Sequence, residues 1–165
     1  MVLIGNCPMV AFVSPLPASA NAAPASATAL ATRPGLAPAA LVALARELAA
    51  AVCREQVPMG EGRRWVRLAD ELDHDAWLIA WPRGSGLGLH DHGGSGAAVH
   101  VVDGELIERY AAGRSRHDVR TRIVGAGELV TFGAGHVHAL HNDADDEALS
   151  VHVYSPPLGP MTFFE

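Results

Sequence analysis

The sequence contains no lysine, and its 12 basic residues, all arginine, face 18 acidic ones, which leaves a net charge of −6. Without lysine, Schiff-base chemistry and a P-loop are excluded. An acidic chain without a basic stripe predicts neither a nucleic-acid partner nor an anionic membrane surface. No apolar run approaches the roughly 18 residues of a membrane span. The two cysteines, Cys7 and Cys53, are too few for a disulfide scaffold or a cysteine-rich zinc site.

Aromatic residues make up only 5% of the chain, and alanine supplies much of its apolar content. Residues 1–37 are rich in alanine and proline, so they have little large apolar surface to bury and are predicted to be a disordered tail. The rest, 38–165, has a length that suits one domain. A cover helix is predicted at 38–57, since Pro38 suits a first helical position. Apolar residues follow at helical spacing, namely Leu41, Leu44, Leu48 and Val52.

From residue 65 on, short runs of branched and aromatic residues are separated by glycine or charged turns. This pattern is typical of an antiparallel all-β sandwich or barrel, and no helical period interrupts it. A doubly wound α/β sheet is therefore not expected. The seven predicted strands are Trp65–Leu68, Ala76–Trp81, Ala97–Val102, Glu105–Tyr110, Thr121–Val124, Glu128–Phe132 and Leu149–Tyr154.

Nine residues are histidine, and three of them form a candidate metal site. His90 and His92 are two residues apart, and such side chains on a strand share one face, so both can reach into a barrel. His138 lies in a second glycine-rich segment that can reach the same point. Three imidazoles with the other positions open are typical of a catalytic metal site.

The remaining histidines outside the C-terminal strand have less defined roles. His136 and His141 flank His138 and are interpreted as solvent-facing or supporting groups, with His136 as a reserve ligand. Those predicted to have no part in the site are His74, His100 and His117.

The two histidine segments resemble the paired motifs of the cupin superfamily, whose fold is a small β-barrel or double-stranded β-helix. The first segment contains His90 and His92, and the second contains His138 and has Gly133 in place of the usual proline. Ala97 stands where many cupins carry a metal-binding Glu. Three neutral ligands leave a divalent metal its full charge, which favours an anionic substrate ligand such as a thiolate.

A third segment narrows the resemblance. Ser150, His152 and Tyr154 alternate with valines on one strand, and Pro156 and Pro157 follow. With the histidine segments, this row resembles the cysteine dioxygenase (thiol dioxygenase) family, in its bacterial type. The resemblance implies a cupin domain with one or two N-terminal helices that uses Fe(II) and O2 to oxidise a small thiol to its sulfinic acid.

The resemblance also assigns roles by position. Arg67 matches the arginine that pairs with the substrate carboxylate, a task for which the planar guanidinium is suited. Ala97 replaces the cysteine that many animal members cross-link to the tyrosine, so no thioether can form. The Ser155–Pro156 peptide is implied to be cis. The assigned iron ligands are His90, His92 and His138, and the assigned catalytic row is Tyr154, oriented by His152 and Ser150.

The predicted activity is therefore a non-haem Fe(II)-dependent dioxygenation of L-cysteine or a related small thiol. The same chemistry on 3-mercaptopropionate, cysteamine or another thiol remains open, as does a non-redox metal-dependent or ligand-sensing cupin. A free-thiol substrate, Fe(II) and two cysteines expected to be unpaired favour the cytoplasm. A monomer or a homodimer is expected.

Overall fold

The computed structural model describes residues 35–57, 60–112 and 118–165. Most of the predicted tail and His117 lie outside these residues, so the division of the chain into tail and domain stays a prediction. No helix in the described part is both long and apolar enough to cross a bilayer. Cys53 is not a free thiol, which corrects the expectation of unpaired cysteines for the one cysteine that is described.

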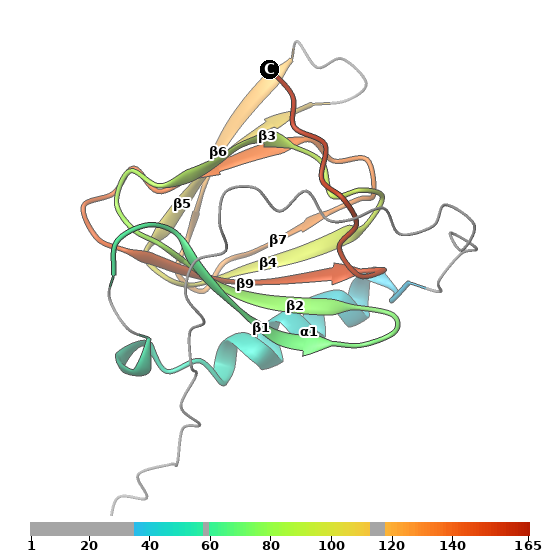
Figure 1. Ribbon diagram of the computed structural model, residues 1–165, viewed down its shortest axis with the longest axis horizontal. Helices are drawn as coiled ribbons and strands as arrows, with labels where there is room; N and C mark the ends of the chain where they lie inside the picture. The colour runs from blue at the N-terminus through green and yellow to red at the C-terminus, as the bar shows by residue number, and fades with distance from the viewer. Residues whose placement is uncertain (1–34, 58–59, 113–117) are drawn as a thin grey trace, which may run out of the picture.

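Two antiparallel sheets face each other and account for the all-β architecture expected from the sequence (Figure 1). The strands are β1 (Arg64–Asp70), β2 (Asp75–Trp81), β3 (Gly86–His90), β4 (Gly96–Asp103), β5 (Glu105–Ala111), β6 (Val119–Gly125), β7 (Leu129–Phe132), β8 (His138–His141) and β9 (Ala148–Ser155). One sheet has the strand order β1-β2-β9-β4-β7 and the other the order β3-β8-β5-β6. All pairs within both sheets are antiparallel.

The helix α1 (Pro38–Ala50) covers the outer face of the five-stranded sheet and packs on β4 and β9 (Figure 1). It ends earlier than predicted, and a short 3-10 helix, η1 (Arg54–Gln56), follows. Ala45 of the helix is fully buried, and Leu41 and Ala49 are almost fully buried. The small side chains of the two alanines let the helix lie close to the sheet. The other residues of the predicted apolar stripe, Leu44, Leu48 and Val52, pack beside them and are partly buried. Removal of this apolar surface from water stabilises the contact.

Alternation along β2 and β9 separates an outer core from a polar inner wall, as expected for strands whose successive side chains point to opposite faces. The outward residues pack under α1 and are Ala76, Leu78, Ala80, Leu149, Val151 and Val153. The alternating residues face the second sheet and are Trp77, Ile79, Trp81, Ser150, His152 and Tyr154. One face of these strands therefore builds the core, and the other is available for chemistry.

After β9 the chain crosses from the five-stranded to the four-stranded sheet (Figure 1). The Ser155–Pro156 peptide is cis, as the family resemblance implied. Further on, Phe163 forms an antiparallel bridge with His90. The amide of Asp91 donates to the carbonyl of Thr162 at 3.0 Å. The C-terminal segment is thereby fixed beside the predicted metal ligands.

Candidate metal centre and pocket

Three buried histidines meet between the sheets. His90 ends β3 and pairs directly with His138, the first residue of β8, while His92 follows β3 by two residues. The Nε2 atoms of His92 and His138 lie 3.1 Å apart. One ring nitrogen of each histidine lies within 4.8 Å of those of the other two. Since metal–nitrogen bonds are about 2.0–2.1 Å long, one ion can bind all three side chains.

The loop that carries His92 is shaped by a tight turn and by the C-terminal segment. Gly93 has a φ of 61°, and a Cβ on it would lie 2.6 Å from the carbonyl oxygen of Pro160, so only glycine fits. A carboxylate oxygen of Asp91 accepts hydrogen bonds from the amides of Gly93 at 3.1 Å and Thr162 at 3.0 Å. The prediction that both histidines lie on one strand is thus met by His90 alone, and this turn positions His92.

The protonation of the three histidines suits metal binding. Burial lowers the pKa of His90 to about 4 and that of His92 to about 3, and it also lowers the pKa of His138. All three are therefore neutral at pH 7, as metal ligation requires. The Nδ1 atom of His90 lies 2.8 Å from the carbonyl of Gly88, and that of His138 lies 2.9 Å from Glu108. Both acceptors need an Nδ1–H, which leaves each Nε2 lone pair free for an ion.

Glu108 is a site residue that the predicted set lacked. It lies on β5 and is fully buried, and its carboxylate accepts hydrogen bonds from His136 and His138. Alternation along the predicted strand Glu105–Tyr110 places it on the inward face with Leu106, which is the signal that could have revealed it. His136 thus supports the site through Glu108. His141, at the other end of β8, belongs to neither group of potential ligands among the described residues.

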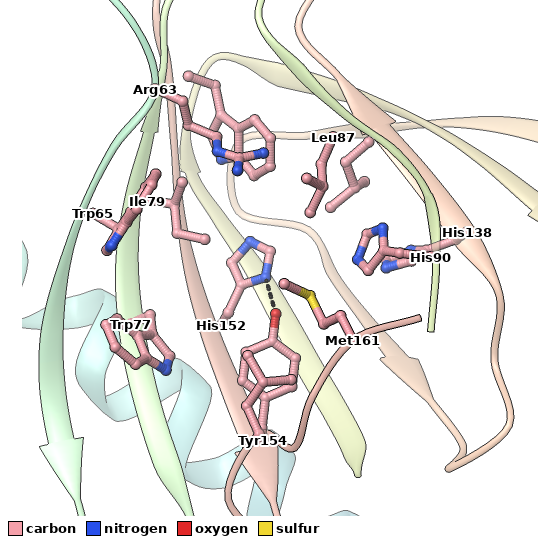
Figure 2. Close-up of a pocket in the computed structure, with 13 residues that line it drawn as sticks. Arg63, Trp65, Trp77, Ile79, Leu87, His90, His138, His152, Tyr154 and Met161 are labelled. Carbon is pink, nitrogen blue, oxygen red and sulfur yellow. Dashed lines mark hydrogen bonds between the residues drawn. The ribbon is translucent and has the colours of Figure 1, made fainter. Parts of the chain in front are cut away.

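A hydrogen-bonded row runs along the inner wall of the five-stranded sheet. The indole Nε1 of Trp81 donates to Ser150 Oγ at 2.8 Å. Ser150 Oγ lies 2.8 Å from His152 Nε2. His152 Nδ1 lies 3.1 Å from the hydroxyl oxygen of Tyr154, a contact that Figure 2 shows. Ala97 is the direct cross-strand partner of Tyr154, so the position that would carry a cross-linking cysteine is adjacent but holds a methyl group. The row joins the three predicted catalytic residues and adds Trp81.

The direction of this row follows from its donors. Trp81 can only donate, and the Ser150 hydroxyl has no acceptor other than His152 among the described residues. Ser150 therefore donates to His152 Nε2, since the proton of the buried hydroxyl would otherwise have no acceptor. Burial lowers the pKa of His152 well below its usual value, so the ring is neutral and its proton lies on Nδ1. Tyr154 accepts that proton's hydrogen bond, and its own O–H can donate into the pocket.

Two of the three histidines, His90 and His138, line one pocket of about 350 Å³ together with His152 and Tyr154 of the row (Figure 2). Figure 2 shows His152 and Tyr154 on one wall and His90 and His138 on the opposite wall. Burial raises the pKa of Tyr154 above its usual value, so the phenol keeps its proton. No acidic side chain lines the pocket within the described part of the chain. The other lining residues are Arg63, Trp65, Trp77, Ile79, Trp81, Leu87, Leu140, Leu158 and Met161.

The arginine that lines the pocket is Arg63, not the predicted Arg67. Arg63 lies 5.4 Å from the ring centre of Trp65 and 5.2 Å from that of Trp81, and it donates to the Gly86 carbonyl at 3.2 Å. It forms no ion pair within the described residues, and burial lowers its pKa. A partly buried guanidinium of this kind can bind an anion that enters the pocket.

Arg67 lies on β1, which begins directly after Arg63, but it is outside the pocket. Its side chain is 45% exposed and forms an ion pair with Asp70 at 2.6 Å. Its guanidinium carbon lies 4.5 Å from the ring centre of Trp77, which stands between it and the pocket wall. The strand β1 also shifts register just after this residue. The structure therefore does not bring Arg67 together with the other predicted site residues.

Residues 56–165 match the family described as cysteine dioxygenase type I. Protein TT1209 of Thermus thermophilus has 20% identity and a TM-score of 0.52, with 60% of this chain and 88% of that one covered. A Klebsiella pneumoniae protein with a double-stranded β-helix domain has 17% identity and a TM-score of 0.55, with 66% and 90% covered. A recombinant oxalate oxidase in complex with glycolate has 21% identity and a TM-score of 0.53, with 64% and 56% covered. At these identities the three structures show the double-stranded β-helix (cupin) fold alone.

Proposed function

Because this chain belongs to the cysteine dioxygenase type I family, we propose that it is a non-haem Fe(II)-dependent thiol dioxygenase that acts on L-cysteine or a related small thiol. The reaction adds both atoms of O2 to the sulfur, so one thiol and one O2 give one sulfinic acid. The observation that carries the proposal is that a cluster of three neutral histidines meets the same pocket, through His90 and His138, as His152 and Tyr154 of the row. A ligand-binding cupin would not need the row.

The three histidines fit a single divalent ion and leave its other positions open. Bound by His90, His92 and His138, Fe(II) would supply the centre at which thiolate sulfur and O2 come together. The protein's own part is positioning. Tyr154 presents its O–H to this centre, and its ring lies 5.1 Å from that of His92. Arg63 is available for the substrate's negatively charged group.

The lining of the pocket favours one class of thiol. Arg63 offers a positive charge at the wall, but no described lining residue offers a negative charge to a substrate ammonium group. Apolar and aromatic side chains form most of the remaining wall and exclude water from the reacting groups. A thiol with a carboxylate and no amine, such as 3-mercaptopropionate, suits this lining and is the second candidate substrate beside L-cysteine. Cysteamine, which has an amine and no carboxylate, is the least suited. A free thiol and Fe(II) both fit a cytoplasmic enzyme.

The proposal is tested by loading the purified full chain with Fe(II) under anaerobic conditions and then adding O2 with one thiol at a time. L-Cysteine, 3-mercaptopropionate and cysteamine are compared, with O2 uptake and sulfinate formation measured together. One sulfinate per O2 consumed is expected from at least one carboxylate-bearing thiol, with both oxygens from ¹⁸O2 in the product. Absence of sulfinate from all small thiols, or full activity with Zn(II) in place of Fe(II), contradicts the proposal.

Trp81→Phe tests the direction of the hydrogen-bonded row. This change removes the indole N–H that donates to Ser150 Oγ, so the Ser150 hydroxyl is held less firmly and the row orients the Tyr154 hydroxyl less well. One lost hydrogen bond is worth about 1 kcal/mol, so kcat is expected to fall about fivefold with little change in KM.

Trp77→Phe is the matched control for this change. Trp77 lies on the same strand and lines the same pocket, but its Nε1 has no hydrogen-bond partner among the described residues. We expect it to lower kcat less than Trp81→Phe does. Equal losses of kcat in the two variants would show that aromatic packing, and not the N–H of Trp81, is what the row requires.

A further inference from the structure

Glu108 is a fully buried carboxylate directly behind one of the three histidines. Its Oε1 atom lies 2.9 Å from His138 Nδ1 and 2.9 Å from His136 Nε2, and Oε2 accepts a hydrogen bond from Arg122 Nε. The side chain is therefore a carboxylate, and each of its three neighbours is a donor to it.

The three predicted ligands differ in the hydrogen-bond partner of their Nδ1 atom. His138 has the carboxylate of Glu108, and His90 has only the neutral carbonyl of Gly88. His92 Nδ1 is buried and has no partner among the described residues. Among the described residues, Glu108 is the one carboxylate that accepts a hydrogen bond from any of the three histidines, and it does so from His138 alone. Glu108 also lies close to the three-histidine site, in which Ala97 offers no carboxylate.

Arg122 partly neutralises the Glu108 carboxylate by donating to Oε2, the oxygen that does not contact His138. It is the direct cross-strand neighbour of Glu108 on β6, and its side chain is 37% exposed. Its guanidinium carbon lies 5.0 Å from the ring centre of Tyr110 and 5.8 Å from that of Phe132, so it is held in place by two aromatic rings. The more strongly Arg122 attracts the carboxylate, the less negative charge Glu108 lends to His138.

We propose that Glu108 is a positioning residue that orients His138 and strengthens it as a metal ligand, and that Arg122 limits this effect. The inference rests on the proposed metal site but not on the identity of the substrate. A carboxylate that accepts a hydrogen bond from a ligating histidine fixes its tautomer and makes the ligand more basic. Removing Glu108 and removing Arg122 should therefore change the affinity for metal in opposite directions, whereas damage to the fold would weaken it in both variants.

The test measures the dissociation constant for Fe(II) on the full chain without oxygen, by competition with a coloured chelator. Glu108→Gln is expected to weaken binding about 10–100-fold, the usual cost of losing such a partner. Arg122→Gln is expected to tighten binding by a factor of a few. Glu147→Gln is the matched control, because Glu147 is another buried carboxylate, paired with Arg64 at 2.7 Å, and is not among the potential ligands. This control should leave the affinity unchanged.

Several outcomes overturn the inference. Wild-type affinity in Glu108→Gln does so, as does an equal loss in Glu147→Gln. If Glu108→Gln does not fold, Arg122→Gln decides, and unchanged or weaker binding contradicts the proposal. Two Fe(II) ions per chain would mean that Glu108, His136 and His138 form a site of their own. Failure of thiol oxidation with these affinities as expected would refute only the proposed function, and thiol oxidation with Glu108→Gln unaffected would refute only this inference.

Discussion

His92→Ala is expected to abolish metal binding and sulfinate formation while leaving the fold intact. The side chain is buried between the other two histidines, with ring centres 5.2 Å from His90 and 4.9 Å from His138. Removing a ligand should lower the metal affinity by more than the roughly 10–100-fold that follows from removing the hydrogen-bond partner of a ligand. Its Nδ1 has no described partner, so the substitution leaves no buried acceptor unpaired. The measurements are Fe(II) affinity and the rise in unfolding temperature on adding Fe(II), which the variant should lack.

His100→Ala is the matched control for this substitution. His100 also has a buried Nδ1 without a partner among the described residues. It lies on β4 three residues after Ala97, so the two side chains point to opposite faces of the sheet. It therefore points away from the pocket, as predicted, and its loss should leave the Fe(II) affinity unchanged. Wild-type affinity in His92→Ala would remove this residue from the metal site. Equal loss in both variants would indicate a general effect on the fold.

Strands with large alternating side chains could be predicted from the sequence, whereas β3 and β8 could not. All seven predicted runs lie within observed strands or overlap them. Gly86–His90 contains two glycines and His138–His141 is only four residues long, so neither has the branched side chains that favour strands. They are strands because they pair with each other and because β8 pairs with β5. Such non-local pairing does not show in local composition, although these two strands bring His90 and His138 together.

In the site, too, the residues of a local motif could be predicted from the sequence, whereas the contacts set by the register between distant strands could not. His90, His92, His138 and the row to Tyr154 were predicted because their spacing within each segment matches a known pattern. The structure clusters the three histidines and brings His90, His138, His152 and Tyr154 to one pocket. The surroundings of these groups depend on which residues of distant strands face each other. Glu108 was missed because nothing within its own strand shows that His138 lies next to it.

The two arginines show how little separates a residue in the pocket from one outside it. Arg63, Trp65 and Arg67 alternate along the chain, so parity alone places all three on the same side of the sheet. Position along the strand then decides, because Arg63 packs near Trp81 whereas Arg67 pairs with Trp77 and the exposed Asp70. The family resemblance assigned the substrate carboxylate to Arg67, whereas the arginine that lines the pocket is Arg63.

Arg63→Ala and Arg67→Ala distinguish these two assignments. A charge-assisted hydrogen bond is worth about 1.5–3 kcal/mol, so Arg63→Ala should raise KM for 3-mercaptopropionate and L-cysteine roughly 10–150-fold. Arg67→Ala should change KM less than about twofold, since its exposed ion pair contributes little. Activity with cysteamine, which has no carboxylate, should respond little to either substitution. Arg63→Lys should recover only part of the loss, because an ammonium group cannot bind a carboxylate through two parallel hydrogen bonds. A large rise in KM in Arg67→Ala with none in Arg63→Ala would instead require the pocket to rearrange around the substrate, so that Trp77 no longer separates Arg67 from it.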